Sequence, residues 1–235
     1  MEREGFSRPC VKSPSTCAIG VMARAPSAAG KTRLAPHLSA ARLAALRAAL
    51  LADTLDVVSR AALTGIDVVI FFTPADGEPE IAALNRDAFP RVCQNSGNLG
   101  QRMRSALEQL IGQRGYGTAL LVGADIPFLS AAAIAAARET LRANGGVVLG
   151  PADDGGYYLI GMTNVHAALF EQIEWGTATV LTDTLRSAER QGIEVRLIGR
   201  AYDIDTIDDL QRLERDLASA PPETAPHVRA WFSEG

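Results

Sequence analysis

The sequence predicts an α/β fold in which strands and helices alternate around a sheet with parallel strands. Apolar runs alternate with segments of helical periodicity along most of the chain, as successive βα units require. The 235 residues are 47% hydrophobic and 21% charged, which is ordinary for a globular protein of one or two domains. The apolar run 120–122 ends at Gly123 and is followed by Asp125. We therefore expect one carboxylate at the carboxyl end of a buried strand, where ligands bind in open α/β sheets.

The amino-terminal third is predicted to contain a strand, a loop and a long helix. The strand is expected at residues 17–22, and the loop at 25–36 is rich in Gly, Pro and basic residues. Ser39 is placed to cap the next helix, because its side-chain oxygen can accept from backbone amides. A 3.6-residue apolar period extends this helix to about residue 62, carried by Leu43, Leu46, Leu50 and Val57.

The remaining elements are assigned by the same two periods, with short apolar runs read as strands and longer periodic segments as helices. Strands are predicted at residues 67–72, 91–94, 118–122, 146–149, 157–161 and 194–198. Helices are predicted at residues 78–85, 99–111, 130–143, 177–191 and 205–217. We expect a mobile extension at 1–16, one domain at 17–219, and a loosely docked tail at 220–235 that Trp231 and Phe232 could anchor.

Charge and composition narrow the class of ligand. The net charge is −4 and no block of Lys or Arg stands out, which argues against a nucleic-acid partner. The cysteines are odd in number and have no metal-ligand spacing, as in a reduced cytoplasmic protein. Residues 1–16 do not have the apolar core of a signal peptide, and no apolar run is long enough for a membrane span. We expect a cytoplasmic protein with a small-molecule ligand.

Two phosphate chemistries compete for the basic loop. Residues 25–32, Ala-Pro-Ser-Ala-Ala-Gly-Lys-Thr, nearly match a P-loop, which would indicate an ATPase or kinase. However, Pro36 would fall inside the helix that a P-loop opens, at a cost of about 3 kcal/mol. The favoured interpretation is an irregular loop in which Lys31 and Arg33, with Arg24, bind a diphosphate. Solvated surface charges are the structural alternative.

Acidic residues near the carboxyl terminus complete a candidate site. Asp203 and Asp205 flank Ile204 shortly before the last predicted helix. Together with Asp125 and the basic loop they indicate a divalent metal that holds a nucleotide diphosphate. The alternative is that Asp205 or Thr206 caps the helix.

Six motifs in order resemble the DUF2064 family, a bacterial branch of the GT-A nucleotide-diphospho-sugar transferases that is similar to molybdenum-cofactor and phospholactate nucleotidyltransferases. They lie at residues 22–34, 97–103, 123–127, 150–158, 175–177 and 203–206. The resemblance covers about residues 17–217 and implies a three-layer α/β sandwich with a mixed, mostly parallel sheet. Most members that resemble this chain have Cys in the Gly-Ser-Asp-Cys-Pro segment, where this sequence has Ile126, so no thiol role is carried over.

The resemblance implies a role for each motif. Nucleotide contacts are expected from Ala23, Arg24, Gly30, Lys31, Arg33, Gly97, Asn98, Gly100, Arg102 and Asp125. The expected ligands of Mg²⁺ or Mn²⁺ are Asp125, Asp203 and Asp205. Substrate contacts are expected from Asp153, Asp154, Gly155, Gly156, Tyr157, Trp175 and Thr177, and catalytic roles fall to Asp153, Asp154, Lys31 and Arg33. The segment 150–158 also fits a hairpin turn, and Trp175 also fits a packing anchor.

The leading function is a metal-dependent glycosyltransferase that uses a nucleotide sugar and a small acceptor. The alternative is a nucleotidyltransferase, for guanylyl or a similar group, that joins a nucleoside monophosphate from a triphosphate to a small phosphorylated acceptor and releases pyrophosphate. A P-loop NTPase or a nucleotide-binding protein without turnover is the third possibility. The same basic and acidic residues would serve both transferases, because each reaction releases a phosphate leaving group.

Overall fold

The computed structural model describes residues 16–85 and 87–234, and within them one sheet has seven strands in the order β3-β2-β1-β4-β6-β5-β7. The strands are β1 (Cys17–Arg24), β2 (Ile66–Thr73), β3 (Arg91–Cys93), β4 (Thr118–Gly123), β5 (Val147–Pro151), β6 (Tyr157–Met162) and β7 (Val195–Leu197). Strand β6 runs antiparallel to β4 and β5, and the other pairs are parallel. The predicted mixed, mostly parallel sheet is confirmed.

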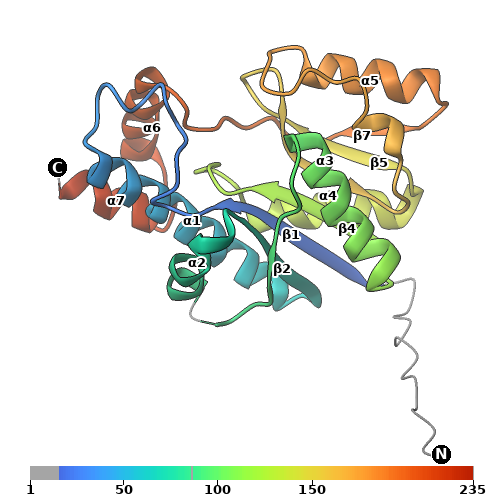
Figure 1. Ribbon diagram of the computed structural model, residues 1–235, viewed down its shortest axis with the longest axis horizontal. Coiled ribbons are helices and arrows are strands. Elements are labelled where there is room, and N and C mark those ends of the chain that lie inside the picture. The colour runs from blue at the N-terminus through green and yellow to red at the C-terminus, as the bar shows by residue number, and fades with distance from the viewer. Residues whose placement is uncertain (1–15, 86, 235) are drawn as a thin grey trace, which may run out of the picture.

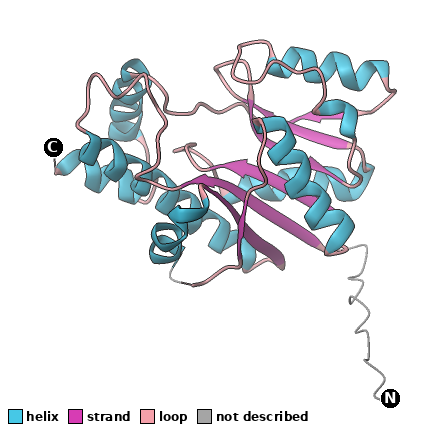
Figure 2. Ribbon diagram, in the orientation of Figure 1, coloured by secondary structure: helices cyan, strands magenta, loops and turns pink. Residues whose placement is uncertain are grey.

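Helices cover both faces of the sheet and complete three layers (Figures 1 and 2). The helices are α1 (Ala40–Ala62), α2 (Glu78–Asn85), α3 (Leu99–Leu107), α4 (Ala131–Asn144), α5 (Val180–Arg190), α6 (Ile207–Ser219) and α7 (Pro226–Ser233). Short helical turns are η1 (Ala75–Gly77), η2 (Glu108–Gln113) and η3 (Ala167–Leu169). Helices α1, α2 and α4 contribute to the core on one face, and α3, η2, η3 and α5 contribute to the core on the other.

The central strands are apolar because both of their faces are buried. In β1, Ile19 and Val21 belong to one core cluster and Ala18 belongs to the other. In β4, Leu120 and Leu121 divide in the same way. The alternation of side chains along a strand thus fills two cores at once.

Several predicted boundaries agree with the structure, and two helices differ. Ser39 accepts a hydrogen bond from the Arg42 amide at 3.2 Å and caps α1, as the sequence predicts. The predicted helix 99–111 is α3 followed by the π-helical turn η2. Helix α5 begins at Val180, later than predicted, because the preceding residues from Gly176 form turns.

The carboxyl-terminal tail is better packed than predicted. Instead of a loose extension it forms α7, whose first helical residue is Pro226, a position that suits the fixed backbone of proline. Both carboxylate oxygens of Asp53 on α1 accept from backbone amides of α7, at 2.9 and 3.0 Å. The Trp231 side chain is 5% exposed, and its indole donates to the Arg42 carbonyl at 3.1 Å. The predicted anchoring by Trp231 is confirmed.

A third core cluster joins the carboxyl-terminal helices to the basic loop. It contains Leu34 from the loop together with residues of α1, α6 and α7. Figure 1 shows this group at one end of the sheet, where the loop after β1 arches beside α6.

Every helix among the described residues is too short or too polar to cross a membrane. The predicted amino-terminal extension lies outside the described residues, apart from Thr16.

Candidate functional site

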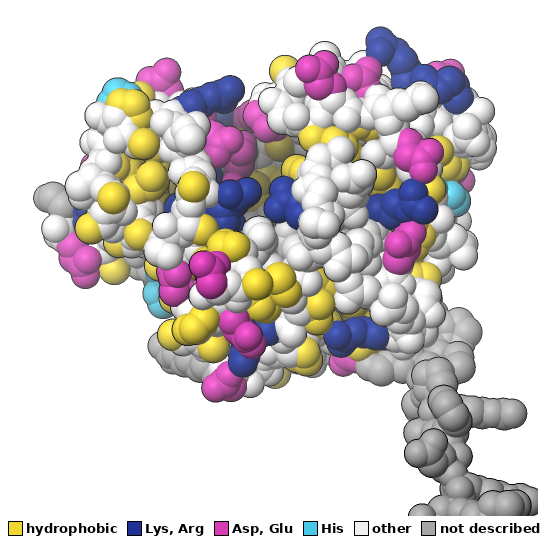
Figure 3. Space-filling model, viewed as in Figure 1, with side chains coloured by type: hydrophobic (Ala, Val, Ile, Leu, Met, Phe, Trp, Pro, Cys, Tyr) yellow, Lys and Arg dark blue, Asp and Glu magenta, His cyan; other side chains and the backbone are white. Residues whose placement is uncertain are grey.

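A cavity of about 500 Å³ opens at the carboxyl ends of β1 and β4. Figure 3 shows basic and acidic side chains meeting at a hollow in this face of the molecule. The predicted site residues that line the cavity are Ala23, Arg24, Gly30, Lys31, Arg102, Asp125, Asp154, Gly156, Tyr157, Trp175, Thr177, Asp203 and Asp205. Those outside its lining are Arg33, Gly97, Asn98, Gly100, Asp153 and Gly155. Six motifs that are far apart in the sequence therefore contribute to, or lie beside, one cavity.

The basic loop is irregular, as the favoured interpretation predicts. Helix α1 begins only at Ala40, so Lys31 and Thr32 do not open a helix as they would in a P-loop. Lys31 has a φ of 50°, in the left-handed region that a lysine seldom adopts. This backbone conformation sets the direction in which the Lys31 side chain leaves the loop, and the sequence pattern alone does not predict it.

Arg47 on α1 holds the start of this loop and was not predicted as a site residue. Its guanidinium donates to the Ala25 carbonyl at 2.9 Å and to the Ala28 carbonyl. The residue is 9% exposed and also lines the cavity. Burial, together with the charge of Arg24, lowers the pKa of Arg47. The sequence signal for this role was that Arg47, a charged residue, lies between Leu46 and Leu50 on the buried side of the helix.

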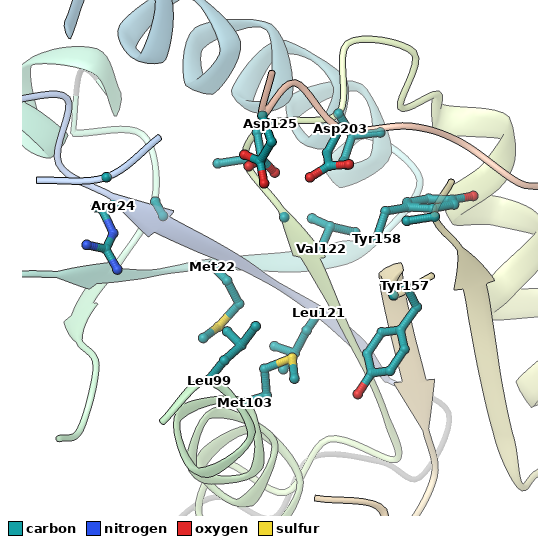
Figure 4. A pocket seen from close by; sticks show the side chains of 18 of the residues that line it. Met22, Arg24, Leu99, Met103, Leu121, Val122, Asp125, Tyr157, Tyr158 and Asp203 are labelled. Carbon is teal, nitrogen blue, oxygen red and sulfur yellow. The ribbon is translucent and has the colours of Figure 1, made fainter. Parts of the chain in front are cut away.

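Three carboxylates gather at one side of the cavity. One oxygen from each of Asp125, Asp203 and Asp205 lies within 4.8 Å of the others. In Figure 4 the carboxylates of Asp125 and Asp203 lie side by side, close to the end of β4. Hard oxygen ligands at this spacing suit Mg²⁺ or Mn²⁺, which in proteins commonly bind one or two carboxylates together with substrate phosphates. The donor set fits the predicted divalent ion.

Lys31 extends into this carboxylate group. Its ammonium lies 3.0 Å from an Asp125 oxygen and 2.9 Å from an Asp205 oxygen, and it also donates to the Ile204 carbonyl. Burial alone would lower the pKa of Lys31, but the charges and hydrogen bonds of Asp125 and Asp205 raise it above its ordinary value. Lys31 is therefore a protonated, buried cation in this arrangement.

Asp203 differs from its two neighbours in this group. Burial is the main cause that raises the pKa of its carboxyl from 3.8 to about 7, and the negative charges of Asp125, Asp205 and Asp154 add to the effect. Like charges at this range disfavour ionisation of one member of a group. A divalent cation would reverse that preference, so the Asp203 carboxyl is suited to respond to metal binding.

Asp153 and Asp154 point to different surroundings. Asp154 lines the cavity, and one of its oxygens accepts from the Gly156 amide at 2.8 Å in the turn that joins β5 to β6. Asp153 lies outside the cavity and pairs with Arg212 of α6 at 2.8 Å. The segment is thus both the hairpin turn that the sequence allows and part of the cavity wall.

The predicted motif 97–103 lines the cavity through Leu99, Arg102 and Met103. Asn98 caps α3 in a reciprocal pair of hydrogen bonds with Gln101, both at 2.9 Å. Arg102 reaches the cavity and donates to the side chain of Gln94 at 3.1 Å. Gln94, which was not predicted, also donates to the Ala23 and Phe71 carbonyls at 3.1 and 2.7 Å. It therefore links Arg102 to β1 and β2.

The other side of the cavity is apolar. Figure 4 shows Met22, Leu99, Met103 and Leu121 gathered there, away from Asp125. Tyr157 and Trp175 extend this surface, with their rings in an edge-to-face contact at 6.2 Å between centroids. The cavity can therefore hold a ligand that is charged at one end and less polar at the other.

A family model described as "Uncharacterized protein conserved in bacteria (DUF2064)" matches residues 54–177, slightly more than half of the chain. Among solved structures, a proposed nucleotide-diphospho-sugar transferase from Desulfovibrio desulfuricans G20 is 28% identical, with a TM-score of 0.83 and coverage of 93% of this chain and 94% of that one. No curated protein matches the chain.

Two more distant structures share the fold. A 4-diphosphocytidyl-2C-methyl-D-erythritol synthase from Anaerococcus prevotii DSM 20548 is 16% identical, with a TM-score of 0.59 and coverage of 88% and 100% of the two chains. A CMP:2-keto-3-deoxy-manno-octonic acid synthetase complexed with CTP is 12% identical, with a TM-score of 0.53 and coverage of 86% and 98%. At these identities the likeness concerns the fold alone.

Proposed function

The chain belongs to the DUF2064 family, and we propose that it is a transferase that moves a sugar from a nucleotide-sugar donor to a small acceptor, with a divalent metal as cofactor. The observation that carries the proposal is the carboxylate group of Asp125, Asp203 and Asp205, with its cationic neighbour Lys31, at the carboxyl ends of the central strands. That edge of an open α/β sheet is the usual place for a nucleotide.

The charged end of the cavity suits the diphosphate of such a donor. Asp125, Asp203 and Asp205 can hold Mg²⁺ or Mn²⁺, which would neutralise charge on the departing diphosphate. Lys31, Arg24 and Arg102 offer cations at the same cavity for the phosphate oxygens. We assign nucleotide contacts also to Ala23 and Gly30, which line it.

Asp154 is our candidate for the general base. It lines the cavity from the β5–β6 turn, and Gly156 fixes its carboxylate through a backbone hydrogen bond. In the proposed step, an acceptor hydroxyl oxygen forms a bond to the anomeric carbon, and the bond from that carbon to the diphosphate breaks. Asp154 takes the hydroxyl proton, and the nucleoside diphosphate leaves with the electron pair.

The predicted substrate residues around this base receive separate roles. Tyr157, Trp175 and Thr177 line the cavity beside Asp154, and we assign them to the sugar or the acceptor. Asp153 serves to hold the turn through Arg212. Arg33 is exposed, so a phosphate role for it would require a ligand that extends toward the loop surface.

The second candidate is a nucleotidyltransferase, which two structural neighbours favour by their own names. In that reaction the acceptor attacks the α-phosphorus of a nucleoside triphosphate, and pyrophosphate leaves. Sugar transfer ranks first because the neighbour at a TM-score of 0.83 is described as a proposed sugar transferase, whereas the cytidyl enzymes reach 0.59 and 0.53.

Coupled assays for the two leaving groups separate these candidates. The purified protein is incubated with Mn²⁺, a panel of nucleotide sugars or nucleoside triphosphates, and a panel of small acceptors. We expect acceptor-dependent release of nucleoside diphosphate, lost in Asp154→Asn and reduced much less in Asp153→Asn. Pyrophosphate release from a triphosphate, with no diphosphate from any nucleotide sugar, would select the nucleotidyltransferase instead.

A further inference from the structure

Lys31 uses all of its hydrogen-bond donors inside the carboxylate group. A lysine ammonium has three N–H donors, and here they meet three acceptors, the side chains of Asp125 and Asp205 and the carbonyl of Ile204. The side chain is 9% exposed. In this arrangement Lys31 has no donor left for a phosphate, although its place in the basic loop predicts that contact.

Lys31 also contacts two of the three carboxylates that a metal ion would need. Asp125 and Asp205 are two of the three residues whose oxygens lie within 4.8 Å of one another, and the ammonium contacts both. A divalent ion cannot approach these oxygens closely while the ammonium stays between them, because the two cations repel each other. The ion and Lys31 therefore compete for these two carboxylates in this geometry.

The backbone is held on both sides of Lys31, and the Lys31 carbonyl itself accepts from the Leu34 amide at 2.9 Å. On one side Arg47 holds the Ala28 carbonyl, and on the other Leu34 is fully buried. Between these anchors, Gly30 and Lys31 have φ values of 157° and 50°. The left-handed conformation at Lys31 carries a backbone cost, which a change in this short segment could relieve.

We propose that Lys31 is a built-in cation that holds the carboxylate group together and competes with the divalent ion for it. This inference rests on the proposed metal and nucleotide site. Metal binding moves the Lys31 ammonium out of the group, and the freed ammonium then pairs with the phosphates of the nucleotide. Metal alone binds weakly because it must displace Lys31, and the nucleotide strengthens metal binding because it accepts the displaced cation.

The first test measures Mn²⁺ binding without nucleotide, by electron paramagnetic resonance of the free ion and by calorimetry. We expect Lys31→Met to bind Mn²⁺ more tightly than wild type by roughly 5- to 150-fold, the usual range of coupling between two sites. Lys31→Arg, which keeps a cation, should not show this gain. The matched control is Arg60→Met, which removes an exposed cation of α1 and should leave Mn²⁺ affinity unchanged.

The second test follows the native lysine and does not depend on how Lys31 variants fold. The sequence contains two lysines, Lys12 and Lys31, so Lys12→Arg leaves a single lysine side chain. We expect amine labelling of Lys31, measured by mass spectrometry of its peptide, to rise as Mn²⁺ is added. The added ion releases the ammonium from its buried contacts.

Equal Mn²⁺ affinity for wild type and folded Lys31→Met would overturn the inference, and so would unchanged Lys31 labelling at saturating Mn²⁺. Either result leaves the metal site and the proposed function standing. If Mn²⁺ binds neither wild type nor Lys31→Met, with or without a nucleoside diphosphate, the proposed function fails as well.

Discussion

Gly100 of α3 lies directly against the indole of Trp175, so closely that a Cβ at position 100 would stand 2.3 Å from the indole Nε1. The ring of Trp175 also stacks on Phe170, at 6.5 Å between centroids. Trp175 therefore has atoms packed on several sides where it forms the cavity wall. Gly100, which we predicted as a nucleotide contact, packs against the Trp175 indole and supports this wall of the cavity.

Gly100→Ala should destabilise the protein by about 1–3 kcal/mol, the usual cost of adding a methyl group to a packed contact. The measurement is the free energy of unfolding in urea, with Trp fluorescence as one probe. Gly112→Ala is the matched control, because no atom lies within 4 Å of a Cβ at that position in η2. Similar stability changes in the two variants would contradict the packing role of Gly100.

Arg47→Met should weaken nucleotide binding although the residue lies on α1. The variant removes the hydrogen bonds that hold the Ala25 and Ala28 carbonyls, and we expect a stability loss of about 1–3 kcal/mol as well. Binding is measured by calorimetry with a nucleoside diphosphate and Mn²⁺. Arg60→Met, at an exposed position of the same helix, is the control. Unchanged affinity in folded Arg47→Met would show that the loop keeps its conformation without this side chain.

The metal-free protein should lose stability as the pH rises from about 4 to 7, and Asp203→Asn should reduce that loss. The folded pKa of Asp203 is raised from 3.8 to about 7, so the folded state keeps a proton that the unfolded state has released. The contribution of Asp203 to the free energy of unfolding is therefore complete below about pH 4 and is lost as the pH rises through about 7. Urea unfolding of both proteins at pH 5 and pH 8 measures the effect.

In that comparison, the free energy of unfolding of Asp203→Asn minus that of wild type should be larger at pH 8 than at pH 5. The reason is that asparagine carries no charge beside Asp125 and Asp205. If the difference between the two proteins is the same at both pH values, Asp203 does not titrate in this range.

Trp231→Ala should lower the free energy of unfolding by about 3–5 kcal/mol, as truncation of a buried aromatic side chain does. The loss also removes the stacking of Arg42, whose guanidinium lies 3.8 Å from the ring centroid. Leu63→Ala is the control, since Leu63 is 87% exposed and should change stability by no more than about 0.5 kcal/mol. A small effect of Trp231→Ala would mean that α7 contributes little to the fold.

The predicted architecture succeeded because its signals are local. The period of α1, the cap at Ser39 and the apolar run of β4 each follow from a few neighbouring residues. The same reasoning placed Asp125 at a strand end, which is where the cavity opens. The short helix α7 was missed because Pro221, Pro222 and Pro226 indicate an irregular tail, whereas a helix of eight residues gains its stability from packing on α1.

The details of the site depend on contacts that no local pattern encodes. Lys31 and Asp205 are 174 positions apart. The sequence does not indicate that the Lys31 ammonium pairs with carboxylates instead of binding a phosphate. Asp153 and Asp154 are neighbours with equal chemistry, and only the turn sends one to Arg212 and the other to the cavity. Sequence patterns therefore predicted which segments meet, while the structure assigned their side chains.

Calorimetric titration of wild type and Asp125→Asn with a panel of nucleoside diphosphates, each with and without Mn²⁺, tests whether Asp125 holds the metal and the diphosphate. We expect wild type to bind at least one of them in a Mn²⁺-dependent manner. Asp125→Asn should lose that affinity by about tenfold or more, equivalent to about 1.4 kcal/mol or more. Its circular dichroism should match wild type, and Asp76→Asn, at an exposed position in η1, should bind normally. Wild-type affinity in folded Asp125→Asn would contradict the claim that this carboxylate holds the metal and the diphosphate.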